Sequence, residues 1–215
     1  MRHQSFSMPD WFIAMDHYKK KPIGRAPWLG FPKIYKASFS IAHTKDAILL
    51  KYYVKNDELR VTFHSPNDPV YKDSCVEFFI SLDKGQSYYN FEWNAIGTCL
   101  AGFGPANEKR TYLPADRIRT IGTYSNIQSA AAGSVTNIQP PSSKGNGVDW
   151  SLVCRIPLEI FIHHKIDTLS GISARANFYK CGDDCPIPHY LVWNDILAPG
   201  PNFHQPDFFG HLSFV

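Results

Sequence analysis

Two neighbouring stretches in the middle of the chain decide the fold. Residues 75–82 read Cys-Val-Glu-Phe-Phe-Ile-Ser-Leu, and residues 88–95 read Tyr-Tyr-Asn-Phe-Glu-Trp-Asn-Ala. Apolar side chains recur at positions 76, 78, 80 and 82, and again at 89, 91, 93 and 95. This two-residue period predicts two β-strands, each with one apolar face. The other face of the second strand carries Asn90, Glu92 and Asn94, so we expect it to be half-buried, with its polar face available for contacts.

Patterns on either side of these stretches predict further strands. Residues 35–41, 150–156 and 172–180 alternate in the same way, and residues 59–63, 190–193 and 212–215 are shorter apolar runs. Residues 47–54 are apolar almost throughout, which indicates a strand buried on both faces. We expect one short helix over residues 157–164, beginning at Pro157, and a long surface excursion over residues 125–148. The chain therefore predicts an all-β, antiparallel, jelly-roll-like sandwich of about nine to eleven strands, with at most short helices.

Composition narrows the function classes. The chain has 215 residues, of which 44% are hydrophobic and 19% charged, which excludes a wholly disordered protein and suits one domain over residues 1–215. A net charge of +3, spread along the chain, is too weak to indicate nucleic-acid binding. No stretch approaches the roughly 18 to 20 apolar residues of a membrane-spanning helix. We therefore expect neither a nucleic-acid partner nor a membrane partner.

Five cysteines, at positions 75, 99, 154, 181 and 185, bear on metal content and compartment. Their spacing is not that of a zinc site, and the histidines form no ligand pair. An odd cysteine count and the lack of a signal segment favour a reducing, cytoplasmic location, with at least three free thiols. A chain trimmed at its start would instead be compatible with an extracellular or periplasmic location.

No catalytic motif for nucleophilic hydrolysis or for nucleotide binding occurs in the chain. Glu77 and Glu92 are the two carboxylates that share the polar strand faces. A glycosidase needs such a pair, one as an acid and one as a base or nucleophile. The simpler interpretation is that both carboxylates accept hydrogen bonds from sugar hydroxyls.

Several segments resemble the family 9 carbohydrate-binding modules. Residues 71–83 are similar to an aromatic and acidic stretch of that family, and residues 88–104 are similar to its next strand pair. Residues 150–161, with Arg155-Ile-Pro-Leu-Glu159, resemble a strand exit, and residues 193–214 resemble the close of stand-alone bacterial relatives. The likeness covers roughly residues 30–215 and implies a sugar-binding β-sandwich of the kind used in polysaccharide degradation.

The resemblance also implies a site. In the family two aromatic rings sandwich the sugar, and Tyr71 and Trp193 fall where those rings lie. Glu77 and Asn94 match polar positions of the family, whereas Glu92 stands where the family has arginine. Arg175 and Asn177, on a neighbouring predicted strand, complete the expected set of hydrogen-bonding residues.

Three functions follow as hypotheses. The leading one is non-catalytic binding of a mono- or oligosaccharide, in the setting of a glycoside hydrolase system. The alternatives are a small glycoside hydrolase that uses Glu77 and Glu92, and a haem-binding relative of the same sandwich class, which would show a Soret band after haem addition. We expect no required cofactor. The resemblance implies a structural calcium ion, although its ligands have no residue-by-residue match in this chain.

Overall fold

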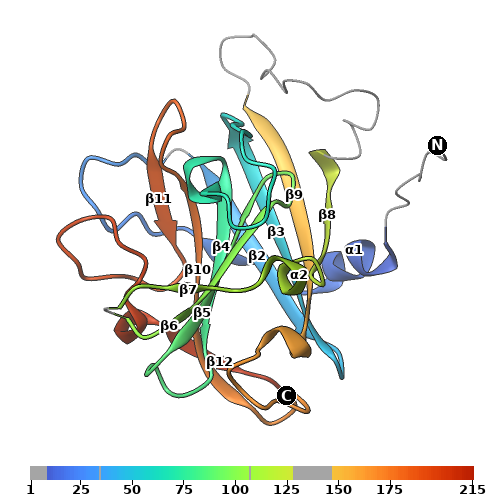
Figure 1. The fold of residues 1–215 in the computed structure, drawn as a ribbon. Helices are drawn as coiled ribbons and strands as arrows, with labels where there is room; N and C mark the ends of the chain where they lie inside the picture. The colour runs from blue at the N-terminus through green and yellow to red at the C-terminus, as the bar shows by residue number, and fades with distance from the viewer. Residues whose placement is uncertain (1–8, 34, 107, 128–146) are drawn as a thin grey trace.

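Two antiparallel β-sheets make up most of the protein. The structure is a computed structural model that describes residues 9–33, 35–106, 108–127 and 147–215. One sheet has five strands in the order β1-β2-β3-β9-β8, and the other has seven strands (Figure 1). The seven-stranded sheet runs β11-β10-β4-β5-β6-β7, and β12 also pairs with β10. The predicted antiparallel β-sandwich is therefore confirmed.

The strand bounds lie close to the sequence patterns. In the five-stranded sheet they are β1 (Lys21–Ile23), β2 (Lys36–His43), β3 (Ala47–Asp57), β8 (Gly122–Ser125) and β9 (Val148–Pro157). In the second sheet they are β4 (Cys75–Ser81), β5 (Tyr88–Asn94), β6 (Cys99–Gly104), β7 (Thr111–Tyr112), β10 (Ser173–Gly182), β11 (His189–Val192) and β12 (Gly210–Ser213). The described residues hold twelve strands, more than the expected nine to eleven, because short pieces such as β1 and β7 carry too few residues to show a period.

Aromatic side chains fill the space between the sheets. Phe78 stacks on Phe178 with ring centroids 4.9 Å apart, and Phe178 stacks in turn on Phe39 of the other sheet at 3.6 Å. Trp150 is 2% exposed, as expected for a core residue, and its indole N–H donates to Asp57 at 2.7 Å. The two-residue period thus produces a continuous inner layer.

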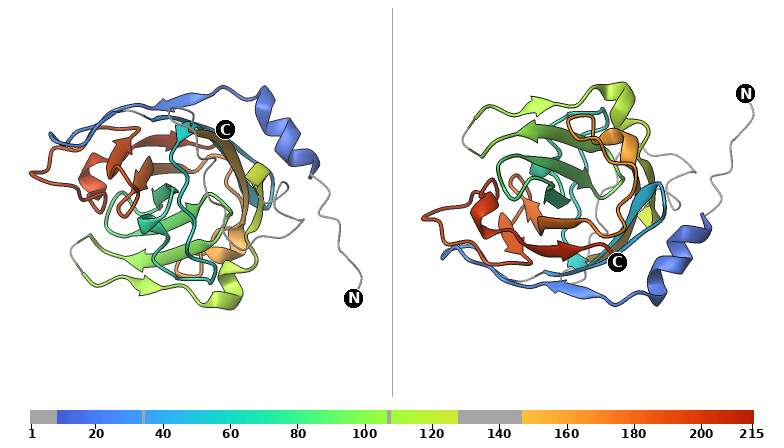
Figure 2. Two further views of the ribbon diagram at one scale, coloured as in Figure 1. Left: turned by 90° about the horizontal axis from the view of Figure 1, so that it is seen from above. Right: turned by 90° about the horizontal axis from the view of Figure 1, so that it is seen from below.

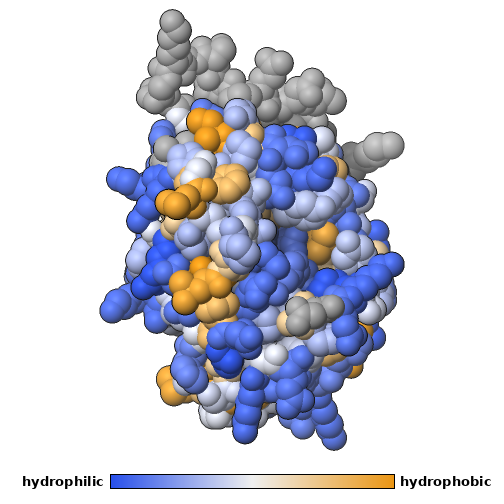
Figure 3. All heavy atoms as spheres, turned by 90° about the vertical axis from the view of Figure 1, so that its left-hand side faces the viewer, coloured by the Kyte–Doolittle hydropathy of each residue, from blue (hydrophilic) through white to orange (hydrophobic). Residues whose placement is uncertain are grey.

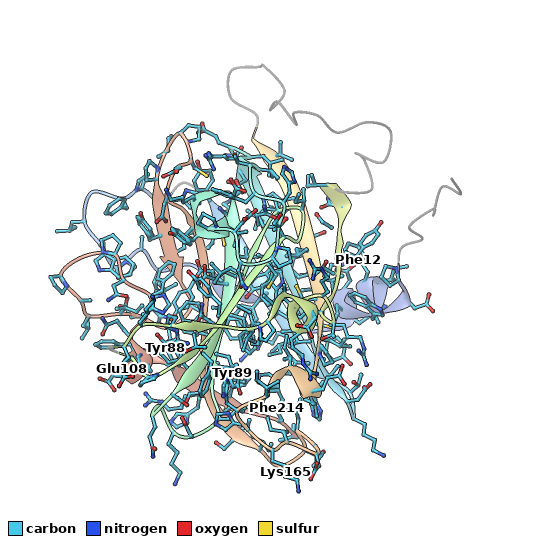
Figure 4. All side chains as sticks on the ribbon, in the orientation of Figure 1. Phe12, Tyr88, Tyr89, Glu108, Lys165 and Phe214 are labelled. Carbon is cyan, nitrogen blue, oxygen red and sulfur yellow. The ribbon has the colours of Figure 1, made fainter. Side chains whose placement is uncertain are left out.

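The consecutive residues Tyr88 and Tyr89 show the alternation directly. Tyr89 packs in the inner layer, whereas Tyr88 belongs to a second cluster on the outer face of the seven-stranded sheet. In Figure 4, Tyr88 lies on the side of Glu108 and Tyr89 on the side of Phe214. One strand therefore serves two separate layers.

The outer face of β4 and β5 is covered, which corrects the expectation of an available polar face. Every residue of both strands is buried. Segments around Val70, Phe203 and Phe209 pack over this face and form the second apolar cluster with Phe79 and Tyr88. The alternation was right about which side chains share a face, but it carried no information about the segments that cover it.

Residues 59–63 do not form the predicted strand. The side chain of Asp73 accepts hydrogen bonds from the backbone N–H groups of Thr62 and Phe63, at 2.9 and 3.0 Å. The backbone of Arg60 pairs with Ser74 instead of with a strand. Side-chain groups have thus taken the place of a ladder partner.

Helices are short throughout the described residues. They are α1 (Asp10–Ala14) and α2 (Ala115–Ile118), with 3-10 turns η1 (Met15–His17), η2 (Val70–Lys72), η3 (Leu158–Ile160) and η4 (Pro206–Phe208). The helix expected over residues 157–164 is only the turn η3, because Pro157 still belongs to β9. Residues 128–146, most of the expected surface excursion, lie outside the described residues.

The N-terminal turns cover the outer face of the five-stranded sheet. The ammonium group of Lys51, on β3, donates to Asp16 at 2.9 Å and to the carbonyl of Phe12 at 2.8 Å. Figure 2 shows α1 lying outside the sheet, beside β8, where Phe12 packs edge-on against Tyr124 at 4.8 Å. This cover buries Lys51 on the outer face of β3, whereas Leu49 and Tyr53 on the same face are half-buried, so the expected burial on both faces is only partly met.

Two further findings concern the whole described chain. All five cysteines are free thiols, in agreement with the expected minimum of three. No described helix has the length and apolar character needed to cross a membrane.

Candidate functional site

A pocket of about 260 Å³ opens on the outer face of the seven-stranded sheet. Three tyrosine rings line it together with an unusual concentration of polar side chains, and we call it the tyrosine pocket. Its lining residues are Tyr71, Glu77, Asn90, Glu92, Leu100, Arg110, Tyr112, Cys181, Asp183, Tyr190, Pro201, Asn202, Phe203 and His204. The side of the molecule that carries β11 is mostly hydrophilic, with its hydrophobic residues in separate patches (Figure 3).

Glu77 and Glu92 lie opposite each other on β4 and β5, at the floor of the tyrosine pocket. They are 2% and 4% exposed. Burial raises the pKa of Glu77 well above its usual range, and the nearby Cys181 and Glu92 add to this effect. Burial also raises the pKa of Glu92 to about 7, although a hydrogen bond from Asn90 opposes the shift. The pocket floor therefore favours proton uptake by this pair.

Arg110, which lies just before β7, brings a positive charge near Glu92 and opposes the rise in the pKa of that carboxyl. Its guanidinium donates to the side-chain oxygen of Asn90 at 2.9 and 3.0 Å and to the carbonyl of Tyr88 at 2.5 Å. Gly102 makes room for this contact, because a Cβ atom there would lie 2.8 Å from Asn90 Oδ1.

Tyr71, Tyr112 and Tyr190 reach the pocket from three different elements. Tyr71 lies on η2, Tyr112 on β7 and Tyr190 on β11. Tyr112 is exposed, whereas the other two rings are half-buried. The Tyr190 hydroxyl donates to Asp183, whose pKa burial raises to about 6. The rings are thus held at the rim by short elements whose positions no sequence period specifies.

Trp193 does not line this pocket. Its ring lies edge-on to Phe39 and Phe178, at 5.9 and 5.5 Å, on the side of the sheet that faces the inner layer. A Cβ atom on Gly210 would come within 2.7 Å of the indole, so the backbone also packs closely on it. The expected pairing of Tyr71 with Trp193 around one sugar is therefore not what the structure presents. Tyr190 is the aromatic residue that β11 directs to the pocket.

The other three expected hydrogen-bonding residues also lie outside the pocket, each engaged in a structural bond. The amide of Asn94 donates to the carbonyl of Phe63 and to Asp73. The Asn177 amide donates to the carbonyl of Asn194 at 2.9 Å. Arg175 donates to the carbonyls at positions 207 and 209. These side chains fasten loops to the sheet, so their polar character in the sequence reflects the covering segments.

The calcium ion implied by the resemblance finds no matching cluster among the described residues. The one group of three candidate ligands found there is Cys75, Glu77 and Cys181. Two thiols do not suit calcium, which prefers six to eight oxygen ligands.

Comparisons with known proteins agree with this fold. A family model described as carbohydrate-binding family 9 matches residues 8–214, and the chain belongs to this family. A candidate carbohydrate-binding protein from Bacteroides uniformis ATCC 8492 is 34% identical, with a TM-score of 0.83; the match covers 94% of this chain and 89% of that one. No curated protein matches the chain.

A more distant family 9 module shares the fold. This module, from Caldicellulosiruptor kristjanssonii, is 15% identical in two structures, one in complex with glucose and one with cellotriose. The TM-scores are 0.54 and 0.53, and the matches cover 97% of this chain and 88% and 86% of the other.

Several residues that line the pocket were not predicted from the sequence. For one of them, Tyr190, the alternation of side chains along the strand could have indicated its position. Trp193 follows directly after β11 and lies three residues beyond Tyr190, so continued alternation places the two rings on opposite faces. Tyr190 pairs with Cys181, which lines the pocket. Arg110, Tyr112 and His204 had no such signal, because loops and a two-residue strand bring them to the site.

Proposed function

We propose that this chain binds a small carbohydrate, without catalysis, in the tyrosine pocket. The observation that carries the proposal is the meeting of three tyrosine rings with Glu92, Arg110 and Asp183 in one pocket of about 260 Å³. A sugar ring presents apolar C–H faces and a rim of hydroxyls. Aromatic rings suit the faces, and charged hydrogen-bonding groups suit the rim, where each unmade bond costs roughly 1 to 3 kcal/mol.

Tyr71 and Tyr190 are the rings assigned to the sugar faces. Both are half-buried, so their positions are restrained before a ligand arrives. Tyr112 is 56% exposed and is assigned to the entrance. The volume of about 260 Å³ lies just below the roughly 300 to 1,000 Å³ of ligand pockets, which supports one or two sugar units as the bound part. The structurally similar family 9 module from Caldicellulosiruptor kristjanssonii has structures in complex with glucose and with cellotriose, so glucosyl sugars are the first ligands to test.

Calorimetry with glucose and cellotriose tests the proposal. We expect Tyr71→Ala and Tyr190→Ala each to weaken binding at least tenfold, about 1.4 kcal/mol. Tyr18→Ala is the matched control, because Tyr18 is 49% exposed and does not line this pocket. Absence of binding to any mono- or disaccharide at millimolar concentration, with and without calcium, would rule the proposal out.

Glycoside hydrolysis is the second candidate, and one observation favours it. Glu77 and Glu92 are directly opposed on adjacent strands, and both side chains line the tyrosine pocket. Retaining glycosidases need carboxyls about 5 to 5.5 Å apart, one of them protonated. Release of nitrophenol from nitrophenyl glycosides, lost in both Glu77→Gln and Glu92→Gln, would establish hydrolysis in place of simple binding.

A further inference from the structure

Two thiols and a carboxylate converge beneath the tyrosine pocket. Cys75 and Cys181 are directly opposed on β4 and β10, and Glu77 follows Cys75 on the same face of β4. The candidate ligand atoms of all three lie within 4.8 Å of one another. Cys181 Sγ lies 3.0 Å from Glu77 Oε1, and Cys75 Sγ lies 3.9 Å from the same oxygen. The sheet register, and not a sequence motif, brings these three atoms together.

These separations suit a tetrahedral metal centre. With zinc–sulfur bonds of about 2.3 Å and zinc–oxygen bonds of about 2.1 Å, tetrahedral ligand atoms lie about 3.6 to 3.8 Å apart. The two observed sulfur–oxygen distances lie on either side of that range. Metal binding would require side-chain rotations that bring both distances close to that range.

Glu92 offers a further carboxyl oxygen beside this cluster. Glu92 is 4% exposed, lines the same pocket and lies opposite Glu77. Its Oε1 accepts a hydrogen bond from Asn90 at 2.9 Å, whereas its Oε2 is buried and has no hydrogen-bond partner in the described structure. A buried carboxyl oxygen without a partner is costly. Glu92 lies outside the group of atoms within 4.8 Å of one another, so its side chain would have to rotate to share an ion with them.

We propose that Cys75, Glu77 and Cys181 bind a thiophilic divalent cation, Zn²⁺, at the floor of the tyrosine pocket, with the Glu92 side chain rotating toward them as the fourth ligand. Thiolates select zinc over calcium and magnesium, which prefer oxygen ligands. Glu77 and Cys181 line the pocket, so the ion has a path from solvent. The proposal goes beyond sugar binding and holds whether or not a sugar occupies the pocket.

Cobalt titration of the reduced full-length chain tests the site, since Co²⁺ replaces Zn²⁺ and reports its ligands by colour. We expect one equivalent of Co²⁺ to give a sulfur-to-cobalt charge-transfer band and the visible bands of tetrahedral cobalt, all removed by Zn²⁺. Cys75→Ala and Cys181→Ala should each weaken binding at least tenfold and reduce the charge-transfer band. Cys154→Ala is the matched control, because Cys154 is buried in the other sheet.

Two further measurements keep the test decisive if a cysteine variant unfolds. Glu77→Gln and Glu92→Gln preserve side-chain shape and should weaken cobalt binding while leaving both thiols in place. Zinc should raise the melting temperature of the wild type and of Cys154→Ala, but not that of Glu77→Gln. Absence of the charge-transfer band, equal competition by Ca²⁺, or unchanged affinity in Glu77→Gln and Glu92→Gln would overturn the proposal.

Discussion

Single residues decide which face of the seven-stranded sheet carries the site. Tyr190 and Trp193 are both aromatic and lie close together in the chain, yet only Tyr190 reaches the tyrosine pocket. Trp193 instead contacts Phe39 and Phe178. An aromatic position matched to a family pattern therefore indicates only the part of the chain in which a binding residue lies. The alternation of side chains along the strand decides which aromatic ring there faces a ligand.

Truncation of the two tryptophans should separate stability from binding. We expect Trp193→Ala to lower the free energy of unfolding by about 2 to 3 kcal/mol, because a half-buried ring loses its edge-on contacts. Trp150→Ala should cost roughly 3 to 5 kcal/mol, because it also removes the donor that Asp57 accepts from. Denaturant unfolding measures both, and neither variant should alter the sugar affinity of the folded fraction. Loss of sugar binding in a folded Trp193→Ala protein would contradict this prediction and would show that Trp193 takes part in sugar binding.

At the level of elements, covering loops turn a polar strand face into a buried one. Asp73 is fully buried and accepts hydrogen bonds from the guanidinium of Arg60 at 2.5 Å and from the amide of Asn94 at 3.0 Å. Together with its bonds to the backbone of Thr62 and Phe63, it fastens residues 60–63 to the sheet. This fastening places η2, and therefore Tyr71, at the pocket rim.

Removal of this carboxylate should loosen the whole covering segment. We expect Asp73→Ala to lower the free energy of unfolding by about 3 to 5 kcal/mol, since buried donors lose their acceptor. Lys72→Ala is the control: its ion pair with Asp184 spans 3.5 Å between exposed side chains and should contribute less than about 1 kcal/mol. Chemical denaturation compares the two, and equal costs would show that Asp73 does not anchor the segment.

The sequence was informative where a period existed and silent where contacts are non-local. The alternation in residues 75–82 and 88–95 predicted two strands and correctly divided their side chains between faces. The prediction failed for residues 59–63, because the side chain of Asp73 accepts the backbone hydrogen bond of Phe63, ten residues away. The alternation also gave no sign of Arg110 or His204. Both residues lie in loops, where no regular spacing of side chains shows that they will reach β5. The strand patterns and the family resemblance both predicted the sandwich, and only the three-dimensional register located the pocket.

At the scale of the whole molecule, several titratable groups are buried, and they couple folding to pH in opposite directions. Burial lowers the pKa of His204 to about 4, and the nearby Arg110 acts the same way. Burial raises the pKa of Glu92 to about 7 and that of Asp183 to about 6. A histidine with a lowered pKa destabilises the fold as pH falls, whereas a carboxyl with a raised pKa destabilises it as pH rises. The wild-type profile is therefore a sum, and single variants are needed to separate its parts.

The contribution of His204 can be isolated with one substitution. The unfolded chain takes up a proton on this histidine near pH 6.5, but the folded chain resists until about pH 4. Its contribution to stability is therefore complete above pH about 6.5 and is lost as pH falls towards 4, at up to about 1.4 kcal/mol per pH unit. His204→Gln, which keeps a partner for the Tyr88 hydroxyl now 2.7 Å from the imidazole, should remove this slope. Denaturant unfolding from pH 7 to pH 4.5 should show the variant gaining stability relative to the wild type as pH falls. His17→Gln, at an exposed position, controls for the exchange itself, and a constant difference between His204→Gln and wild type across that range would contradict the prediction.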